Sequence, residues 1–138
     1  MKNFNFDQYW DITKNTKRAK EYFENALAYN IGPSALKYLI ENDLESFNLI
    51  DVRKYEDYIE GHIPYATHVP FDKIYDNWKQ FTKDKPNILC SSGPFCHLAK
   101  KCAAIAADHG YPVMELSGGF KAWKKHDYEI IKDAADMG

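Results

Sequence analysis

Hydrophobic side chains near the start of the chain recur with the periodicity of an α-helix. Ala19, Tyr22, Phe23, Ala26 and Leu27 recur at intervals of three and four residues, which places them on one face of a helix. A second helix is expected to start near position 34, after a Gly-Pro pair. We expect this helical extension, residues 1–30, to pack on the main domain, residues 31–138. Self-association is the alternative use of its apolar face.

From residue 48 onward, short apolar runs alternate with amphipathic stretches. The runs predict strands over 48–52, 67–69, 87–90 and 112–116. The stretches between and after them predict helices over 54–60, 72–81, 96–109 and 120–126. Strands and helices that alternate through short loops indicate an α/β fold, with a parallel sheet covered on both faces. Ligands of such sheets bind at the carboxyl ends of the strands, beside helix N-termini.

Composition narrows the picture to a globular protein without an obvious polyanionic partner. The chain has 138 residues, of which 45% are hydrophobic and 28% are charged, and its net charge is −2. These values predict a packed core and give no basic footprint for nucleic acid or for a membrane surface. No stretch reaches the ~20 apolar residues that cross a bilayer. The first ten residues do not resemble a secretory signal, so we expect a cytoplasmic location.

The candidate chemistry lies in the loop after the third predicted strand. The only three cysteines, Cys90, Cys96 and Cys102, fall within 13 residues, a pattern that does not fit a secreted disulfide framework. Cys90 ends a strand and is followed by the small residues Ser91, Ser92 and Gly93. A loop that curls around the sulfur, together with the next helix N-terminus, would favour the nucleophilic thiolate. The alternative is a buried, inert cysteine at a strand end.

Four segments of the chain, in order and spacing, resemble one known family. They are Leu49-Ile50-Asp51-Val52-Arg53, then Tyr58 with Gly61-His62-Ile63-Pro64 and Ala66, then Cys90 with Gly93, and finally Gly110-Tyr111, Leu116, Gly118-Gly119 and Trp123. Residues from about 34 to 126 thereby resemble the rhodanese-like domain. The resemblance implies a five-stranded parallel sheet flanked by helices, preceded here by the helical extension.

The resemblance also implies an activity, the transfer of sulfane sulfur. Cys90 would be the catalytic residue, taking sulfur from a small-molecule donor and passing it to a thiol or protein acceptor, with no metal or organic cofactor. The substrate would bind along the loop, at Ser91, Ser92, Gly93, Pro94, Phe95 and Cys96. The alternative is a non-catalytic or redox-sensing interaction module that keeps the fold.

Three positions depart from the family's pattern. Many catalytic members carry an arginine late in the loop, where this chain has Phe95, so strongly anionic donors such as thiosulfate are expected to bind weakly. The sixth residue after Cys90 is Cys96, not the arginine that a phosphatase of this fold uses. Tyr65 replaces the glycine that usually follows Gly-His-Ile-Pro.

Supporting roles remain open between function and structure. Asp51 and Arg53 would either orient the site or form structural ion pairs with Glu56 or Asp57. His62 is expected to be a structural hydrogen-bonding residue, and His97 would either tune the thiolate or lie exposed at a helix start. Cys96 would resolve an oxidised Cys90 as a disulfide or simply occupy the helix start.

Overall fold

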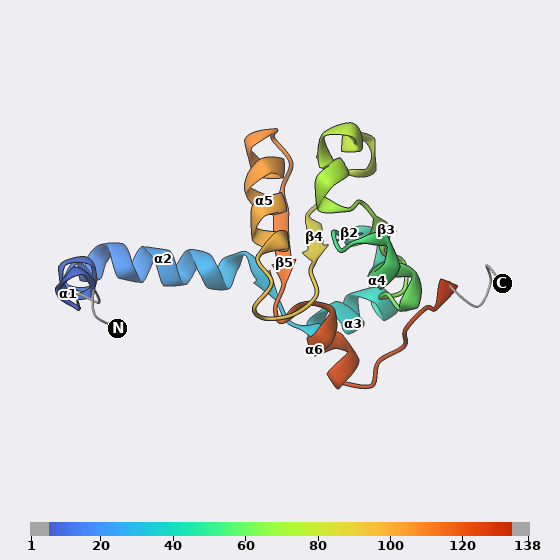
Figure 1. Ribbon diagram of the computed structural model, residues 1–138, viewed down its shortest axis with the longest axis horizontal. Coiled ribbons are helices and arrows are strands. Elements are labelled where there is room, and N and C mark those ends of the chain that lie inside the picture. The colour runs from blue at the N-terminus through green and yellow to red at the C-terminus, as the bar shows by residue number, and fades with distance from the viewer. Residues whose placement is uncertain (1–5, 134–138) are drawn as a thin grey trace.

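The computed structural model describes residues 6–133, and its central element is a parallel sheet of five strands (Figure 1). The strand order is β1-β5-β4-β2-β3. The strands are β1 (Asn30–Ile31), β2 (Asn48–Asp51), β3 (Thr67–His68), β4 (Asn87–Cys90) and β5 (Val113–Leu116). The predicted α/β fold is confirmed. Periodicity alone did not predict β1, because two residues are too short to show a pattern.

Helices cover both faces of the sheet, and the side chains of each strand alternate between two cores. Leu49 and Ile88 pack with α3 (Pro33–Asn42) and α6 (Gly119–Lys125) on one face. Ile50 and Leu89 pack on the other face with α5 (Leu98–Asp108) and the 3₁₀ helices η2 (Phe71–Asp76) and η3 (Trp78–Gln80). The strands β2 and β4 are short apolar runs because both of their faces are buried. The remaining short helices are η1 (Leu44–Ser46) and α4 (Tyr55–Glu60).

Two predicted helices differ from the structure in their details. The segment 72–81 forms the two 3₁₀ helices instead of one α-helix, because Asn77 has a non-helical backbone conformation between them (φ −130°). Its amide hydrogen-bonds to Ile74 three residues back, which closes the first 3₁₀ helix. Helix α5 begins at Leu98 and not at Cys96, and Gly110, with φ +87°, follows its end. No helix within residues 6–133 is long and apolar enough to span a membrane.

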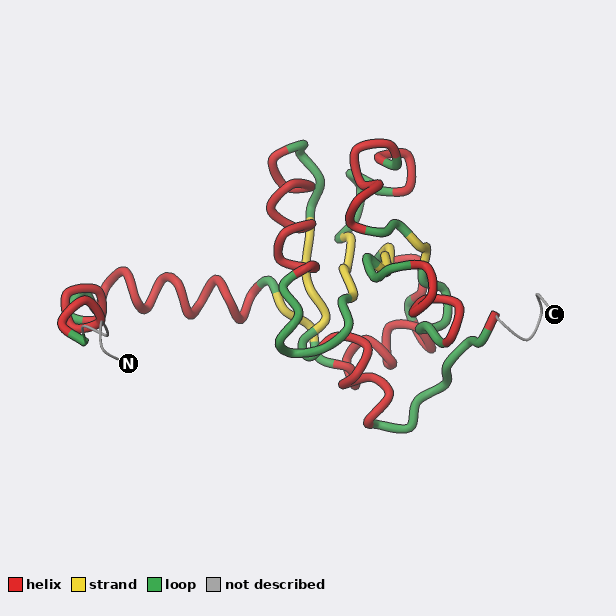
Figure 2. Tube along the Cα trace, viewed as in Figure 1, coloured by secondary structure: helices red, strands yellow, loops and turns green. Residues whose placement is uncertain are grey.

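The N-terminal extension projects away from the sheet as an arm (Figures 1 and 2). The arm consists of α1 (Asp7–Thr13) and α2 (Thr16–Ala28), and neither helix has a buried residue. The expectation that residues 1–30 pack on the domain stays a prediction, but helices α1 and α2 extend away from the sheet (Figure 1). The physical reason is that α2 leads straight into β1, which joins the sheet beside β5, so the helix leaves the domain at the sheet's edge.

Candidate active site

Cys90 lies at the carboxyl end of β4, in the interior of the sheet. Its backbone is in register with Asp51 of β2, and its carbonyl accepts a hydrogen bond from the amide of Val52 at 3.0 Å. Because side chains alternate along β4, Cys90 points to the same face as Ile88, toward α3 and α6. Only 1% of the residue is exposed. The sheet thus presents one thiol at the edge where this fold class binds ligands.

The sulfur of Cys90 is held as a thiol in this arrangement. Its Sγ donates to the carbonyl of Ser91 at 3.5 Å. Burial raises the pKa of Cys90 well above its ordinary value, and the carboxylate of Asp51 raises this pKa further, while the guanidinium of Arg53 lowers it. A carbonyl, and not an amide, faces the sulfur. The predicted cradle of N–H groups around the thiolate is therefore not formed in this state of the loop.

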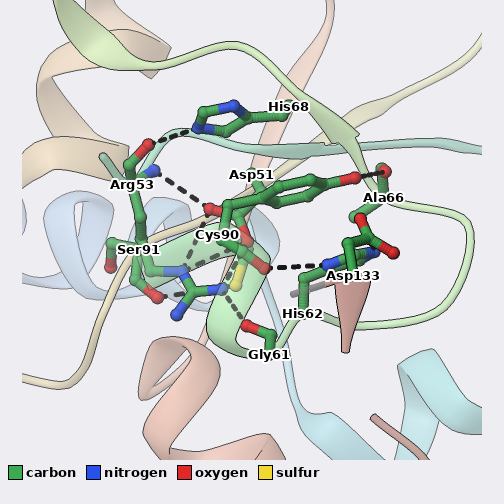
Figure 3. A network of polar contacts seen from close by, with 10 residues as sticks. Asp51, Arg53, Gly61, His62, Ala66, His68, Cys90, Ser91 and Asp133 are labelled. Carbon is green, nitrogen blue, oxygen red and sulfur yellow. Dashed lines mark hydrogen bonds and ion pairs between the residues drawn. The ribbon is translucent and has the colours of Figure 1, made fainter. Parts of the chain in front are cut away.

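Arg53 carries the positive charge that acts on this thiol, and Asp51 fixes its position (Figure 3). Asp51 accepts hydrogen bonds from the backbone amide of Arg53 at 3.0 Å, from Nε at 3.1 Å and from Nη2 at 2.8 Å. Nη2 also donates to the carbonyl of Gly61 at 2.7 Å. The guanidinium lies 4.1 Å from the ring centre of Phe120. Arg53 therefore forms its ion pair with Asp51, and within residues 6–133 neither residue forms one with Glu56 or Asp57.

This pairing keeps Arg53 charged although only 4% of the residue is exposed. Burial lowers the pKa of Arg53, but the hydrogen bonding to Asp51 and the negative charge of its carboxylate outweigh it, so the pKa is raised. A fixed cation beside a buried thiol stabilises the thiolate more than it would in water, because the local dielectric is low. Of the two roles left open for Asp51 and Arg53, orientation of the site fits this geometry.

The loop after Cys90 is clamped to the start of α6. The amide of Phe120 donates to the carbonyl of Ser91 at 2.8 Å, and the amide of Lys121 donates to that of Ser92 at 2.9 Å. This contact requires glycine at position 119, where φ is +61°. A Cβ there would lie 2.6 Å from the Ser91 oxygen and 2.9 Å from the Gly93 nitrogen. Phe120 and Gly119 are site residues that sequence reasoning did not assign, although the Gly-Gly pair was visible.

The sequence and the fold of this chain match a known protein family. A model of the rhodanese-like domain matches residues 33–126, more than half of the chain. The chain belongs to the rhodanese-like domain family. The BH2092 protein of Bacillus halodurans has a crystal structure similar to this chain, with a TM-score of 0.77 and 35% sequence identity. The match covers 85% of this chain and 86% of that one.

Two curated relatives carry informative names. A sulfurtransferase of Allochromatium vinosum is 30% identical over 90 residues, which are 64% of this chain and 82% of that protein. An HTH-type transcriptional regulator of Mycobacterium tuberculosis is 34% identical over 76 residues, which are 55% of this chain but only 34% of the regulator. This chain thus spans about a third of the regulator's length. The first name supports a rhodanese-like sulfurtransferase family, and the second shows a similar sequence inside a larger protein.

The remaining residues of the predicted loop, 91–96, differ in how far they are exposed to solvent. Ser91 is buried, Gly93 and Cys96 are half-buried, and Ser92, Pro94 and Phe95 are exposed. Phe95 is 91% exposed, so the position where many family members carry arginine faces solvent. All three cysteines are free. His97 is exposed and precedes α5 without a capping hydrogen bond from its side chain.

His62 and His68 lie beside the Asp51–Arg53 pair (Figure 3) and belong to one aromatic stack. The ring of Tyr58 lies between those of His62 and His68, with centroids 3.8 and 4.4 Å away. His62 Nδ1 lies 2.9 Å from the carbonyl of Tyr58, and His68 Nε2 lies 2.7 Å from the carbonyl of Arg53. These contacts fit the structural role predicted for His62. The stacking of Tyr58 and His68 was not predicted, since only tertiary packing brings the two together.

The described part of the chain contains no cluster of side chains that could bind a metal ion. Within residues 6–133, no three His, Cys, Asp or Glu side chains are grouped so that they could hold a metal ion. The polar groups around Cys90 instead pair with one another: the carboxylate of Asp51 with the guanidinium of Arg53, and the thiol with a carbonyl. What the arrangement offers chemically is one sulfur nucleophile beside one fixed cation.

Proposed function

We propose that this protein is a sulfurtransferase that carries sulfane sulfur as a persulfide on Cys90 and passes it to a thiol or another nucleophilic acceptor. The observation that carries the proposal is the position of Cys90. It is a free thiol at the carboxyl end of an interior strand, next to a guanidinium that Asp51 holds in place. The relative named as a sulfurtransferase supports the same function.

The proposed reaction needs no oxidant or reductant. The thiolate of Cys90 attacks the sulfane sulfur of a donor R–S–S⁻, a new S–S bond forms on Cys90, and the donor's S–S bond breaks to release R–S⁻. An acceptor thiolate then attacks the outer sulfur of the persulfide, takes it, and leaves Cys90 as thiolate again. Arg53 would stabilise the negative charge in both states of the cysteine. Loss of the proton ends the hydrogen bond from Sγ to the Ser91 carbonyl.

The donor is proposed to be an organic persulfide in preference to thiosulfate. The loop from Ser91 to Phe95 carries no cationic side chain, and Arg53 directs its Nε and Nη2 donors to Asp51 and Gly61. A dianion would therefore lack the bidentate contact that a loop arginine supplies. A singly charged persulfide requires less compensation.

A redox-sensing or interaction module is the second candidate, and two observations favour it. The sulfur is almost fully buried and the pKa of Cys90 is raised, which slows a nucleophile at neutral pH. In addition, a relative named as a transcriptional regulator contains a similar segment in about a third of its length. This candidate predicts that Cys90 takes up no sulfur and that the domain binds a macromolecule instead.

Steady-state sulfur transfer separates the two candidates. Thiosulfate, inorganic polysulfide and glutathione persulfide serve as donors, with dithiothreitol as acceptor. The wild type is expected to transfer sulfur, and Cys90→Ser is expected to lose at least about 100-fold in kcat/KM, because the nucleophile is gone. Cys102→Ala is the matched control, since Cys102 is a free cysteine buried in the opposite core. Equal activity of wild type and Cys90→Ser with every donor would rule out the proposal.

A further inference from the structure

The N-terminal arm exposes large apolar side chains that nothing in the described chain covers. Trp10 and Ile12 of α1 are 62% and 70% exposed, and Tyr22, Phe23 and Leu27 of α2 are 65%, 63% and 78% exposed. Tyr22, Phe23 and Leu27 share the predicted apolar face of α2. Water-exposed clusters of this size on a soluble domain mark an interaction surface.

The two helices of the arm are too short to be stable on their own. Helix α2 has 13 residues and α1 has 7, and isolated helices shorter than about 12–15 residues are marginal in water. Between them lies a hollow of about 640 Å³, lined by Ile12, Ala19, Tyr22 and Phe23 among others. A partner side chain would fill this hollow and bury the apolar face.

The charges of α2 indicate what that partner is. Its first half is basic, with Lys17, Arg18 and Lys20, and its second half contains Glu21 and Glu24. Lys20 and Glu24 lie one turn apart on the same side of α2 and form an ion pair within the helix. An antiparallel copy of α2 would place each Lys20 beside the other copy's Glu24. It would also oppose the two helix dipoles.

We propose that the arm is a self-association surface, on which α2 packs antiparallel against α2 of a second copy of this chain. At about 200 Å² for each complete side chain and the exposed fractions given above, the five side chains offer roughly 700 Å². This is close to the ~800 Å² per partner of a standard interface. Alanines at positions 19 and 26, also on this face, allow the two helices to approach closely.

The similarity to the BH2092 protein reaches into this arm. Residues 33–138 are 106 of the 138 residues, or about 77% of the chain, whereas the superposition covers 85%. Part of the extension therefore has a structural counterpart in that protein at 35% identity. The arm is thus not peculiar to this chain.

Sedimentation equilibrium of the full chain over a range of concentrations tests the association. We expect a dimer for the wild type. Tyr22→Lys is expected to weaken association by roughly thirtyfold, as for a central aromatic anchor. Tyr38→Lys is the matched control, because Tyr38 on α3 is exposed to a similar extent (64%) and is expected to leave the dimer intact. A wild type that is monomeric at ~100 μM, or equal effects of the two substitutions, would overturn the proposal.

A charge exchange tests the antiparallel arrangement itself. Lys20→Glu and Glu24→Lys each place like charges on one flank, so each variant alone is expected to associate about tenfold more weakly than the wild type. An equimolar mixture is expected to recover heterodimers, because the two flanks are again complementary. Circular dichroism checks that both variants keep their helices. A mixture that stays as weak as its components would contradict the antiparallel pairing.

Discussion

Three influences act on the pKa of the Cys90 thiol, two in one direction and one in the other. Burial and the carboxylate of Asp51 hold its proton, and the guanidinium of Arg53 favours its release. Burial is the largest of the three, and the pKa of Cys90 is raised. The folded state therefore holds this proton more tightly than the unfolded chain does, so this group's contribution to stability is present at neutral pH. That contribution is lost as the pH rises above the thiol's ordinary pKa.

The raised pKa predicts how fast Cys90 reacts at different pH values. In a Cys96→Ser/Cys102→Ala background, alkylation of Cys90 by iodoacetamide is expected to be slow at about pH 7 and still rising at about pH 10, because only the thiolate reacts. The measurement is the rate of thiol loss across this range, with a free cysteine peptide as reference. A rate that reaches its plateau below the pH at which the peptide does would contradict the raised pKa.

The uncharged side chain of Phe95 is expected to affect which sulfur donor the protein prefers. Its side chain is 91% exposed, so Phe95→Arg removes little packing and adds a cation late in the loop. We expect kcat/KM for thiosulfate to rise about tenfold through charge-assisted contacts, with a smaller change for glutathione persulfide. Phe95→Gln, which is polar but uncharged, is the control. Equal effects of arginine and glutamine on the thiosulfate reaction would show that charge at this position does not limit the donor.

Among the elements, the contact between the Cys90 loop and α6 shapes the site. Two backbone hydrogen bonds join the carbonyls of Ser91 and Ser92 to the first turn of α6. The Gly119 backbone lies so close to the loop that no side chain fits between them. This clamp fixes which loop carbonyl faces the sulfur.

Gly119→Ala is expected to destabilise the protein by about 3 kcal/mol. An alanine at φ +61° costs roughly 1–2 kcal/mol, and the methyl group would clash with the Ser91 carbonyl. Gly32→Ala is the control, since φ is −82° there and nothing lies within 4 Å of an added Cβ. It is expected to cost less than about 1 kcal/mol. Urea unfolding measures both, and equal losses would show that the loop does not depend on this close approach.

The same elements show how far the sequence could predict the structure. The buried strands β2, β4 and β5 were predictable, because they are continuous apolar runs between turn residues. The strand β1 was not, since its two residues gain their conformation from pairing with β5. The candidate site was located from motifs. Its geometry was not, because the contact of Arg53 with Phe120 and its hydrogen bond to Gly61 depend on segments that only tertiary packing brings together.

At the scale of the whole molecule, the sheet domain and the arm are built differently. The domain buries its strands between two helical layers and gathers its reactive groups at one edge, whereas the arm buries no residue. The arm begins beside β1, at the opposite end of the sheet from β3. Association through the arm would thus leave the edge around Cys90 open to donors and acceptors.

The central claim, that Cys90 carries sulfur, is tested most directly by the mass of the intact chain after incubation with a sulfur donor. We expect an addition of ~32 Da, which peptide mapping locates on Cys90 and which an acceptor thiol removes. Cys90→Ser should show no such addition. No adduct with thiosulfate, polysulfide or glutathione persulfide, or an adduct that persists in Cys90→Ser, would contradict it.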